Sequence, residues 1–579
     1  MASTVAEVVV ATLKASGVRR VYGLPGDSLN GFTDAIRRDG EISWQHVRHE
    51  EGAAFAAAGE ASITGRLAVC AGSCGPGNLH LINGLFDAHR SGVPVLAVAA
   101  HIPRVEIGGG YFQETHPPEL FRECSAYAEL VSIPEQLPRL LHIAMRTALS
   151  RRGVAVLVVP GEIFLDQAVG ETEARSIYPT SSTICPDEAS LDRAAALLGG
   201  AERVTILAGA GCEGAHDELV SLAAALQAPV VHALRGKAFV EYENPYDVGM
   251  TGLLGFSSGY RAMEHCDALL MLGTDFPYRQ FYPPAGVPVI QVDVRGEHIG
   301  RRVPVEVPLV GTVKDTAAAL LARISPKSDR EHLDRMRAHY ARARKRLDAL
   351  ASEDRNRTPL HPQFVAATID RLASDDAVLL ADVGSPTVWA ARYLTMNGRR
   401  RLLGSFTHGT MANALPQAVG VQASQPGRQV VSLSGDGGLA MLLGELLTLR
   451  QQRLPVKVVV FNNGSLAFVE LEMKAAGIVN FGTELENPDF AAVARAVGLH
   501  ALRVERPDQL EGAITESFAH DGPSLLDVVT RRQELSMPPK VTLEQIKGFT
   551  LYATRTIISG RADEIVELAR TNLRELGSE

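Results

Sequence analysis

Residues 430–465 read VVSLSGDGGLAMLLGELLTLRQQRLPVKVVVFNNGS, and this stretch predicts a strand, a helix and a second strand in succession. The first apolar run ends at a turn of glycines around Asp436, and the second, VKVVVF, follows Pro455. Between them we expect one amphipathic helix, because apolar residues recur at roughly helical spacing: Met441, Leu442, Leu446 and Leu449. Such a unit closes as a right-handed crossover with its two strands parallel.

Two polar side chains follow the ends of these strands. In doubly wound sheets, ligands bind beyond the carboxyl ends of the strands, so we expect the oxygens of Asp436 and Asn463 to converge there. A carboxylate and an amide oxygen suit Mg²⁺, which prefers oxygen ligands and is often shared with phosphate. The glycines on either side of Asp436 would let backbone N–H groups approach that phosphate at a helix N-terminus.

Taken separately, these features also fit an ordinary turn after a strand and an Asn-Asn-Gly turn. Their combination is more specific, because GDG, 24 residues and then NN resembles the thiamine diphosphate signature of the pyruvate decarboxylase and acetolactate synthase superfamily. The resemblance implies that thiamine diphosphate and Mg²⁺ are cofactors. It also implies three metal ligands, which are Asp436, Asn463 and the backbone carbonyl of Ser465.

Composition narrows the class of protein. The chain has 579 residues, which suggests three or four domains, and 46% of them are hydrophobic. Its net charge of −9 and its lack of a basic cluster give no reason to expect nucleic acid binding. We expect no signal peptide at the N-terminus, no membrane-spanning run and reduced thiols at its six cysteines, which together indicate a cytoplasmic protein.

Glu50 is the expected catalytic carboxyl group. RHEEGAAFAAAGEA, with Glu50 at the start of an alanine-rich helix, resembles the glutamate motif of the superfamily, and GPGNLHLINGL resembles its companion segment. A glutamate at the start of a helix is otherwise only a favourable placement in the helix dipole. Glu50 fits the motif better than Glu51, because Ala53 and Ala54 then fall at the expected offset. Its implied role is to hydrogen-bond the aminopyrimidine ring and assist proton removal.

The resemblance also assigns cofactor and substrate contacts in the first and third domains. The expected contacts to thiamine diphosphate are Gly384, Ser385, Gly409, Thr410, Met411, Gly437, Gly438 and Leu466. Met411 would wedge the two rings of the cofactor into a bent shape, and Gly409 would offer its carbonyl to the aminopyrimidine. The expected substrate contacts are Phe112, Gln113 and Phe468. An aromatic ring followed by an amide at 112–113 suits a small 2-oxo acid, although the loop GGGYFQETHPPELF alone is equally typical of a surface turn.

A middle domain is expected to bind FAD. Its GxGxxG at Gly209, Gly211 and Gly214 is a weak dinucleotide signal, because no acidic residue follows at the usual distance. HALRGK, GMTGLLGFSSGY, LGTDFPYRQFYP and VIQVDVRG resemble the FAD-binding domain of flavin-containing relatives. That resemblance implies three groups of FAD contacts, which are Thr251, Gly252, Leu253, Leu254; Thr274, Asp275, Phe276, Tyr278; and Val292, Asp293, Val294, Arg295, Gly296. Asp293 ends an apolar run and would contact the ribose.

The expected architecture is therefore α/β, with three doubly wound parallel-sheet domains and a C-terminal amphipathic tail. The expected domains are 1–182 for the pyrimidine end of the cofactor, 183–340 for FAD, 341–533 for Mg²⁺ and diphosphate, and 534–579 for the tail. The shared helix–Pro–strand layout of GVPVLAVAA and RLPVKVVVF hints that the first and third domains follow one plan. Apolar residues at helical spacing predict a helix in the tail: Ala562, Ile565, Val566, Ala569, Leu573 and Leu576.

The tail resembles that of the bacterial quinone-reducing pyruvate oxidases, where it covers the active site and binds lipid. The resemblance implies oxidation of pyruvate to acetate and CO₂, with electrons passing through FAD to a membrane quinone. It also implies a homo-oligomer, expected to be a dimer of dimers, on the inner face of the cell membrane. Residues 561–579 are acidic and lack aromatic anchors, which argues for weak lipid binding. A flavin-containing carboligase of the acetolactate synthase kind, a phosphate-dependent pyruvate oxidase and a non-catalytic scaffold remain alternatives.

Overall fold

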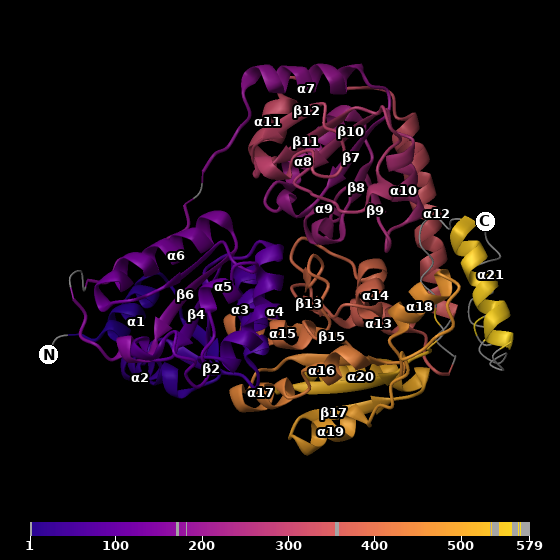
Figure 1. Cartoon of the computed structure of the whole chain (residues 1–579). Coiled ribbons are helices and arrows are strands. Elements are labelled where there is room, and N and C mark those ends of the chain that lie inside the picture. Colours follow the sequence, from indigo (N-terminus) through magenta and orange to yellow (C-terminus); the bar gives the residue numbers. More distant parts are fainter. Residues whose placement is uncertain are drawn as a thin grey trace.

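The computed structural model describes residues 3–169, 173–180, 182–353, 358–532, 534, 543–558, 565–566 and 568. These residues form three α/β units, each around a six-stranded sheet in which every pair of neighbouring strands is parallel. Figure 1 shows the first unit at lower left, the second at the top and the third below it at the right. The predicted fold class is confirmed.

The first unit has the strand order β2-β1-β3-β4-β6-β5. Its strands are β1 Arg20–Gly23, β2 Ser43–His46, β3 Ala68–Gly72, β4 Val95–His101, β5 Tyr127–Leu130 and β6 Val154–Pro160, and its helices are α1 Val5–Ala15, α2 Asn30–Asp39, α3 Glu50–Thr64, α4 Pro76–Ser91, α5 Pro117–Leu120 and α6 Leu137–Arg151. β4 and β6 are buried along their whole length. Continuous runs of valine and alanine form these strands because helices cover both faces of the sheet.

The second unit has the order β12-β11-β10-β7-β8-β9. Its strands are β7 Val204–Ala208, β8 Val230–His232, β9 Asp247–Met250, β10 Ala268–Leu272, β11 Val289–Asp293 and β12 Val307–Val310, and its helices are α7 Glu188–Gly200, α8 His216–Leu226, α9 Lys237–Val240, α10 Ser257–Glu264 and α11 Val313–Leu321. Numbered within the unit and read from its other edge, the order is 3-2-1-4-5-6, which is the order of dinucleotide-binding Rossmann sheets. The crevice beyond the carboxyl ends is therefore the expected ligand position.

The third unit has the order β14-β13-β15-β16-β18-β17. Its strands are β13 Val378–Ala381, β14 Arg401–Gly404, β15 Val430–Gly435, β16 Lys457–Asn462, β17 His500–Val504 and β18 Ser524–Val529, and its helices are α13 Pro362–Leu372, α14 Ser385–Tyr393, α15 Ala414–Ser424, α16 Asp436–Met441, α17 Glu445–Gln452, α18 Ala467–Ala475, α19 Phe490–Ala496 and α20 Pro507–Ala519. Numbered within each unit, the first and third orders are identical. This confirms that the two units share one plan.

The helix expected between β15 and β16 is two helices, and this part of the prediction is wrong. α16 ends at Met441 and α17 begins at Glu445. Met441 is 58% exposed, whereas Leu446 and Leu449 are buried as expected. The break turns the carboxylate of Glu445 inward, where it accepts hydrogen bonds from the backbone N–H groups of Arg48 and His49 (3.1 Å each). The first residue of the second helix therefore contacts a distant part of the chain.

The first and third units are joined by a close contact between α3 and α15. Side chains of both helices belong to one hydrophobic cluster that continues into both sheets. The helices approach closely enough that a Cβ atom on Gly420 would lie 1.8 Å from the backbone oxygen of Ala56, and one on Gly59 would lie 2.3 Å from that of Gln417. Glycine is required at both positions for this approach. The helix that begins at Glu50 is thereby fixed against the third unit.

Two further helices pack on these units, and the first of them connects the second unit to the third. α12, Glu331–Glu353, packs on α10 of the second unit and on α13 of the third, so the predicted boundary at residue 340 falls inside a continuous helix. α21, Leu543–Ile558, lies against α18 at the right of Figure 1. Of the predicted tail helix around Ala562–Leu576, nearly all residues lie outside the described ones. Among the described residues, no helix combines the length and the hydrophobicity needed to span a membrane.

Candidate active site

Asp436 is the first residue of α16, directly after β15, and its carboxylate joins two loops. Oδ2 accepts hydrogen bonds from the backbone N–H groups of Asn463 (3.1 Å) and Gly464 (2.7 Å) and from the amide of Asn487 (2.8 Å). Oδ1 accepts one from the N–H of Gly437 (2.9 Å). Asp436 is only 3% exposed, and its burial raises the pKa of the carboxyl group. The two strand ends meet as predicted.

The loop after β16 completes a set of hard oxygen donors. The side-chain oxygen of Asn463 accepts the N–H of Ser465 (3.0 Å). The hydroxyl of Ser465 donates to Glu470 instead of facing the loop, which leaves its backbone carbonyl as the possible ligand. A carboxylate, an amide oxygen and a carbonyl fit Mg²⁺, and the remaining positions suit water and phosphate oxygens. Asn487, which also donates to Oδ1 of Asn462 (3.0 Å), is a neighbour that the sequence analysis missed.

Glycines after Asp436 let neighbouring side chains pack closely against the start of α16. A Cβ atom on Gly438 would lie 1.8 Å from Oδ2 of the buried Asp382, and one on Gly437 would lie 2.9 Å from Leu466 and 3.3 Å from Met411. The predicted contacts Gly437, Leu466 and Met411 are thus brought together. Gly384, with φ of 114°, precedes Ser385 at the start of α14, beyond the end of the neighbouring strand β13. N–H groups at these turns are suited to hold an anion.

The buried carboxyl group of Asp382 should make the free energy of unfolding depend on pH. Burial raises the pKa of Asp382 to about 7, whereas an aspartate in the unfolded chain titrates near about 4. The folded protein therefore keeps a proton that the unfolded chain loses, so this contribution to stability falls as the pH rises through the folded pKa. In cofactor-free protein we expect Asp382→Asn to remove a slope of up to about 1.4 kcal/mol per pH unit from the free energy of unfolding.

The measurement is urea unfolding of wild-type protein and the variant at several pH values between roughly 4.5 and 7.5. Asp375→Asn, at an exposed position of the same unit, is the control and should keep the wild-type slope. Equal slopes in wild type and Asp382→Asn would contradict the prediction.

Glu50 lies at the start of α3 and is 5% exposed. Its Oε2 lies 2.9 Å from Nδ1 of His80, and its Oε1 lies 3.1 Å from where a Cβ atom of Gly77 would stand. The ring of His80 stacks on that of His49 with centroids 4.2 Å apart. His80 belongs to the quoted segment GPGNLHLINGL but was not selected from the sequence. The donor atoms of the three residues lie within 4.8 Å of one another, so they could also hold a metal ion.

Asn83 connects the Glu50 region to the loop before Met411. Its amide donates to Glu51 (2.7 Å) and to the hydroxyl of Thr410 (2.9 Å), and its oxygen lies 2.9 Å from Nε2 of His408. Gly409, with φ of 81°, forms the turn of this loop, and Ser405 accepts its N–H (3.1 Å). Among the described residues, no hydrogen bond joins Glu50 itself to the loop around Asp436. The homo-oligomer expected from the sequence stays a prediction.

The predicted substrate residues lie on two separate elements. Gln113 packs over Gly75, where a Cβ atom would lie 2.8 Å from the Cβ of Gln113, next to the turn that contacts Glu50. Its side-chain oxygen accepts a hydrogen bond from the thiol of Cys74 (3.3 Å). Phe112 is 78% exposed, whereas Phe468 is half-buried on α18 against the core of the third unit. Phe112 thus belongs to the first unit and Phe468 to the third.

The predicted FAD residues lie beyond the carboxyl ends of three strands of the second sheet. Thr251 to Leu254 follow β9, Thr274 to Tyr278 follow β10, and Asp293 ends β11, with Val292 inside that strand and Val294 to Gly296 after it. A Cβ atom on Gly252 would lie 3.0 Å from Phe276, so the first two segments are in contact. The carboxylate of Asp275 is bound by Arg302 (2.8 and 3.1 Å) and Arg301 (3.1 Å). Burial raises the pKa of Asp293, whose Oδ1 accepts the N–H of Arg295.

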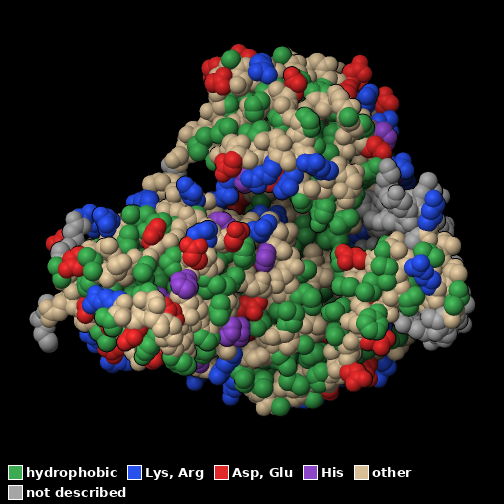
Figure 2. Space-filling view, viewed as in Figure 1, with side chains coloured by type: hydrophobic (Ala, Val, Ile, Leu, Met, Phe, Trp, Pro, Cys, Tyr) green, Lys and Arg blue, Asp and Glu red, His purple; other side chains and the backbone are tan. Residues whose placement is uncertain are grey.

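Arginines line the side of the second unit that faces the other two. Figure 2 shows basic side chains gathered along that edge. Arg295 donates to backbone oxygens of Arg151 and Arg152 in the first unit. Arg235 donates to the backbone oxygen of Ser91 in the first unit (2.6 Å) and to the hydroxyl of Thr407 in the third (3.3 Å). Positive charge beside a Rossmann-ordered sheet fits the diphosphate of a dinucleotide. Arg235 lies in the quoted segment HALRGK but was not selected.

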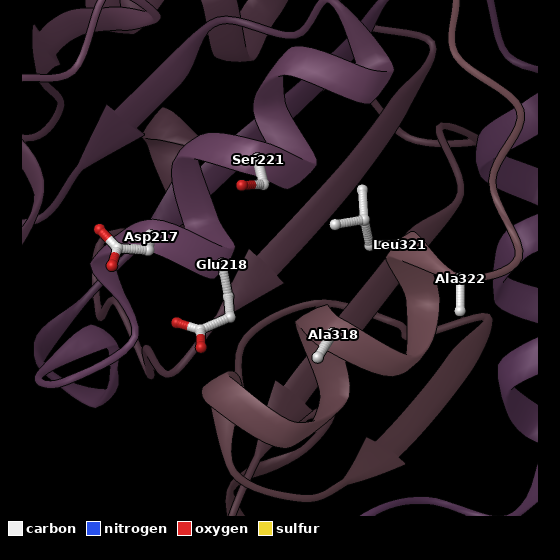
Figure 3. A pocket seen from close by; sticks show the side chains of 6 residues that line it. All are labelled: Asp217, Glu218, Ser221, Ala318, Leu321 and Ala322. Atoms are coloured by element: carbon white, nitrogen blue, oxygen red, sulfur yellow. The ribbon is translucent and has the colours of Figure 1, made fainter.

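A shallow hollow on the second unit is separate from these groups. It lies between α8 and α11 and is lined by Asp217, Glu218, Ser221, Ala318, Leu321 and Ala322 (Figure 3). None of its lining residues is a predicted cofactor or substrate contact. Two carboxylates, those of Asp217 and Glu218, belong to its lining and would repel an anionic cofactor. The hollow is therefore not part of the candidate active site.

The fold and the site together define a class of enzyme with two α/β units of the same strand order. One unit presents a buried glutamate, and the other presents a loop whose oxygen donors suit Mg²⁺ and a diphosphate. Comparison with known families agrees. Residues 3–120 match the N-terminal TPP binding domain of thiamine pyrophosphate enzymes, residues 191–320 match the central domain, and residues 382–528 match the C-terminal TPP binding domain. The chain belongs to the thiamine pyrophosphate enzyme family.

Relatives that match most of this chain differ in the activities by which they are described. A protein of Bacillus subtilis described as "Putative thiamine pyrophosphate-containing protein YdaP" is 37% identical over 98% of each chain. The pyruvate oxidase of Lactiplantibacillus plantarum is 31% identical over 90% of this chain and 87% of its own. The large subunit of acetolactate synthase isozyme 2 of Escherichia coli is 32% identical over 90% and 95%. Identity alone does not favour the oxidase over the synthase.

Proposed function

We propose that this protein oxidises pyruvate to acetate and CO₂ and passes the electrons through FAD to a membrane quinone. The balanced reaction consumes pyruvate, water and quinone and yields acetate, CO₂ and quinol. Bound thiamine diphosphate would supply a nucleophilic carbon and an electron sink for decarboxylation, and bound FAD would accept two electrons. The residues of the chain bind and orient these groups and move protons.

The roles of the residues follow from their positions. Asp436, Asn463 and Ser465 would hold Mg²⁺ and, with the turns at Gly384 and Gly437, the diphosphate. Glu50 would hydrogen-bond the aminopyrimidine, with His80 holding its carboxylate from the other side (2.9 Å). Residues beyond β9, β10 and β11 would bind FAD, with Arg235 and Arg295 beside its diphosphate. Gln113 would contact the substrate.

One observation favours the quinone-reducing reaction over carboligation. α21 follows the last residue matched by the family, 528, and packs on α18, the helix that carries Phe468. Nζ of Lys474 lies 5.7 Å from the ring centre of Tyr552, and Arg555 donates to the backbone oxygen of Gly477 (2.8 Å). A C-terminal segment resting on a predicted substrate helix suits an enzyme whose site responds to a membrane surface. The similarity to acetolactate synthase supports a flavin-containing carboligase as the second candidate.

An anaerobic visible spectrum decides between these candidates. The protein is purified with Mg²⁺ and thiamine diphosphate, and its spectrum is recorded before and after pyruvate is added. We expect pyruvate to bleach a flavin band and a soluble quinone to restore it, because an electron-carrying FAD is reduced by substrate. A flavin band that persists while CO₂ is released would favour the carboligase. No flavin band at all would contradict the FAD assignment.

Assembly and location are part of the proposal. We propose a dimer of dimers, with the first unit of one subunit facing the third unit of another, attached peripherally to the inner face of the cell membrane. Light scattering tests the oligomer, and sedimentation with phospholipid vesicles, with and without pyruvate, tests the attachment. Acetyl phosphate among the products would instead indicate a phosphate-dependent pyruvate oxidase.

A further inference from the structure

The carboxylate of Glu470 is buried behind the loop of Asn463 and Ser465, and none of the roles above uses it. Glu470 lies on α18 and its side chain is 1% exposed. Its Oε1 accepts hydrogen bonds from the hydroxyl of Ser465, from that of Thr483 (3.0 Å) and from Nε and Nη2 of Arg532 (3.1 and 2.6 Å). One oxygen therefore holds donors from three separate segments of the chain.

These three segments surround the proposed metal loop. Residues 464–466 pair with residues 483–485 through two backbone hydrogen bonds, from Leu466 to Thr483 and from Leu485 to Gly464 (2.9 Å each). Arg532 follows β18, and its guanidinium also reaches Glu484 (3.2 Å). The backbone around Ser465 is thus held from one side by the paired segment and from the other by the Glu470 carboxylate.

Two cationic side chains pair with the carboxylate of Glu470. Burial alone would raise its pKa, but hydrogen bonds from Arg532 and Ser465 and the charge of Lys474 outweigh burial and lower the pKa. Nζ of Lys474, itself 2% exposed, lies 3.4 Å from the second carboxylate oxygen. Buried ion pairs add little net stability compared with apolar packing, whereas their fixed geometry can specify a single arrangement. A fixed arrangement is what a metal ligand in the adjacent loop requires.

We propose that Glu470 is a positioning residue for the Mg²⁺ site, acting through Ser465 to fix the loop that carries the metal ligands. The inference rests on the proposed function only in taking this loop as the site of Mg²⁺ and diphosphate. Neither Glu470 nor Arg532 touches the reacting atoms in this proposal. Their effect is on the affinity for the metal and not on the chemical step.

The test is the Mg²⁺ dependence of thermal unfolding at saturating thiamine diphosphate. In Glu470→Gln, the Mg²⁺ concentration for half-maximal stabilisation should rise about 10–100-fold, the usual effect of removing a residue that orients metal ligands. Activity should show the same shift in its Mg²⁺ dependence, while the KM for pyruvate stays unchanged and kcat recovers at high Mg²⁺. Arg532→Lys, which keeps the charge, should show a smaller shift than Arg532→Gln.

Glu60→Gln is the matched control. Glu60 is also a buried glutamate paired with an arginine, Arg20 (2.7 and 2.9 Å), and it accepts the hydroxyl of Tyr22 (2.6 Å), but it lies in α3. A general loss of stability lowers the unfolding temperature of both variants, whereas only Glu470→Gln should shift the Mg²⁺ midpoint. An unchanged midpoint in Glu470→Gln, or an equal shift in both variants, overturns the proposal.

Ser465→Ala keeps the proposal testable if Glu470→Gln does not fold. This variant leaves the charges of Glu470, Arg532 and Lys474 paired and keeps the backbone carbonyl, yet it removes the hydrogen bond to the loop. Its Mg²⁺ midpoint should rise several-fold, and a wild-type midpoint would overturn the positioning role. If Mg²⁺ and thiamine diphosphate do not stabilise even the wild-type protein, the proposed function fails as well. If they stabilise the wild type and the variants at the same Mg²⁺ concentration, only the positioning role of Glu470 fails.

Discussion

Glu50→Gln should lower the rate of CO₂ release from pyruvate by about 10²–10⁴-fold, the usual contribution of a positioned acid–base group. Glutamine keeps the size of the side chain and can still accept a hydrogen bond from His80, which lies 2.9 Å from the carboxylate. It cannot exchange a proton with the aminopyrimidine. The turnover should therefore be lost while the fold and the stabilisation by Mg²⁺ and thiamine diphosphate are largely kept. The assay is CO₂ release at saturating cofactor, together with thermal unfolding.

Glu51→Gln is the control, because it distinguishes the two adjacent glutamates of the motif. The carboxylate of Glu51 accepts a hydrogen bond from Asn83 (2.7 Å), and a glutamine oxygen can accept the same bond. We expect less than about a tenfold loss, the value of one ordinary hydrogen bond. If Glu50→Gln retains wild-type turnover, or if Glu51→Gln is the inactive variant, the assignment of Glu50 is wrong.

Patterns that depend on nearby residues could be predicted from the sequence. β15 and β16 are mostly apolar because parallel strands are buried on both faces, and residues at their ends lie close together because neighbouring strands end at one edge of the sheet. For the same reason the carboxylate of Asp436 lies 3.1 Å from the backbone N of Asn463, whereas the predicted convergence of their side-chain oxygens on a metal stays a prediction. The common plan of the first and third units was also visible in the repeated helix–Pro–strand layout.

Residues whose importance depends on distant partners could not be selected from the sequence. Asn487 contacts Asp436 across 51 positions, and nothing in its own Asn-Pro turn points to that carboxylate. In the sequence, Glu470 is not distinguishable from an ordinary polar residue of a helix. Its role depends on Arg532, which is 62 positions later in the chain and donates a hydrogen bond to it. Glu445, the first residue of α17, likewise accepts a hydrogen bond from the backbone of Arg48, 397 positions away. Helical periodicity in a sequence indicates which face of a helix is buried. It does not indicate which buried polar groups will need hydrogen-bond partners from distant segments.

The second large effect is expected at Asp436, which combines a metal-ligand role with an unfavourable buried charge. Because burial raises its pKa, the ionised carboxylate destabilises the cofactor-free fold, and this cost grows as the pH rises through the folded pKa. Asparagine removes that charge but keeps only one acceptor oxygen, so it cannot accept both the N–H of Gly437 and the donors bound by Oδ2. Cofactor-free Asp436→Asn should therefore lose the part of the pH dependence of stability that this carboxyl group contributes.

The same substitution should abolish the response to Mg²⁺ and thiamine diphosphate, because it removes the negative charge from the ligand set. A ligand that binds only the folded state raises stability by about 2.7 kcal/mol at 100 times its dissociation constant. We expect wild type to show such a rise in thermal unfolding and Asp436→Asn to show almost none, with activity lost in parallel. Asp293→Asn, another buried aspartate at the end of a strand, should keep the rise because it faces the second unit. A variant that gains stability with cofactor as wild type does would show that Asp436 serves the fold and not the metal.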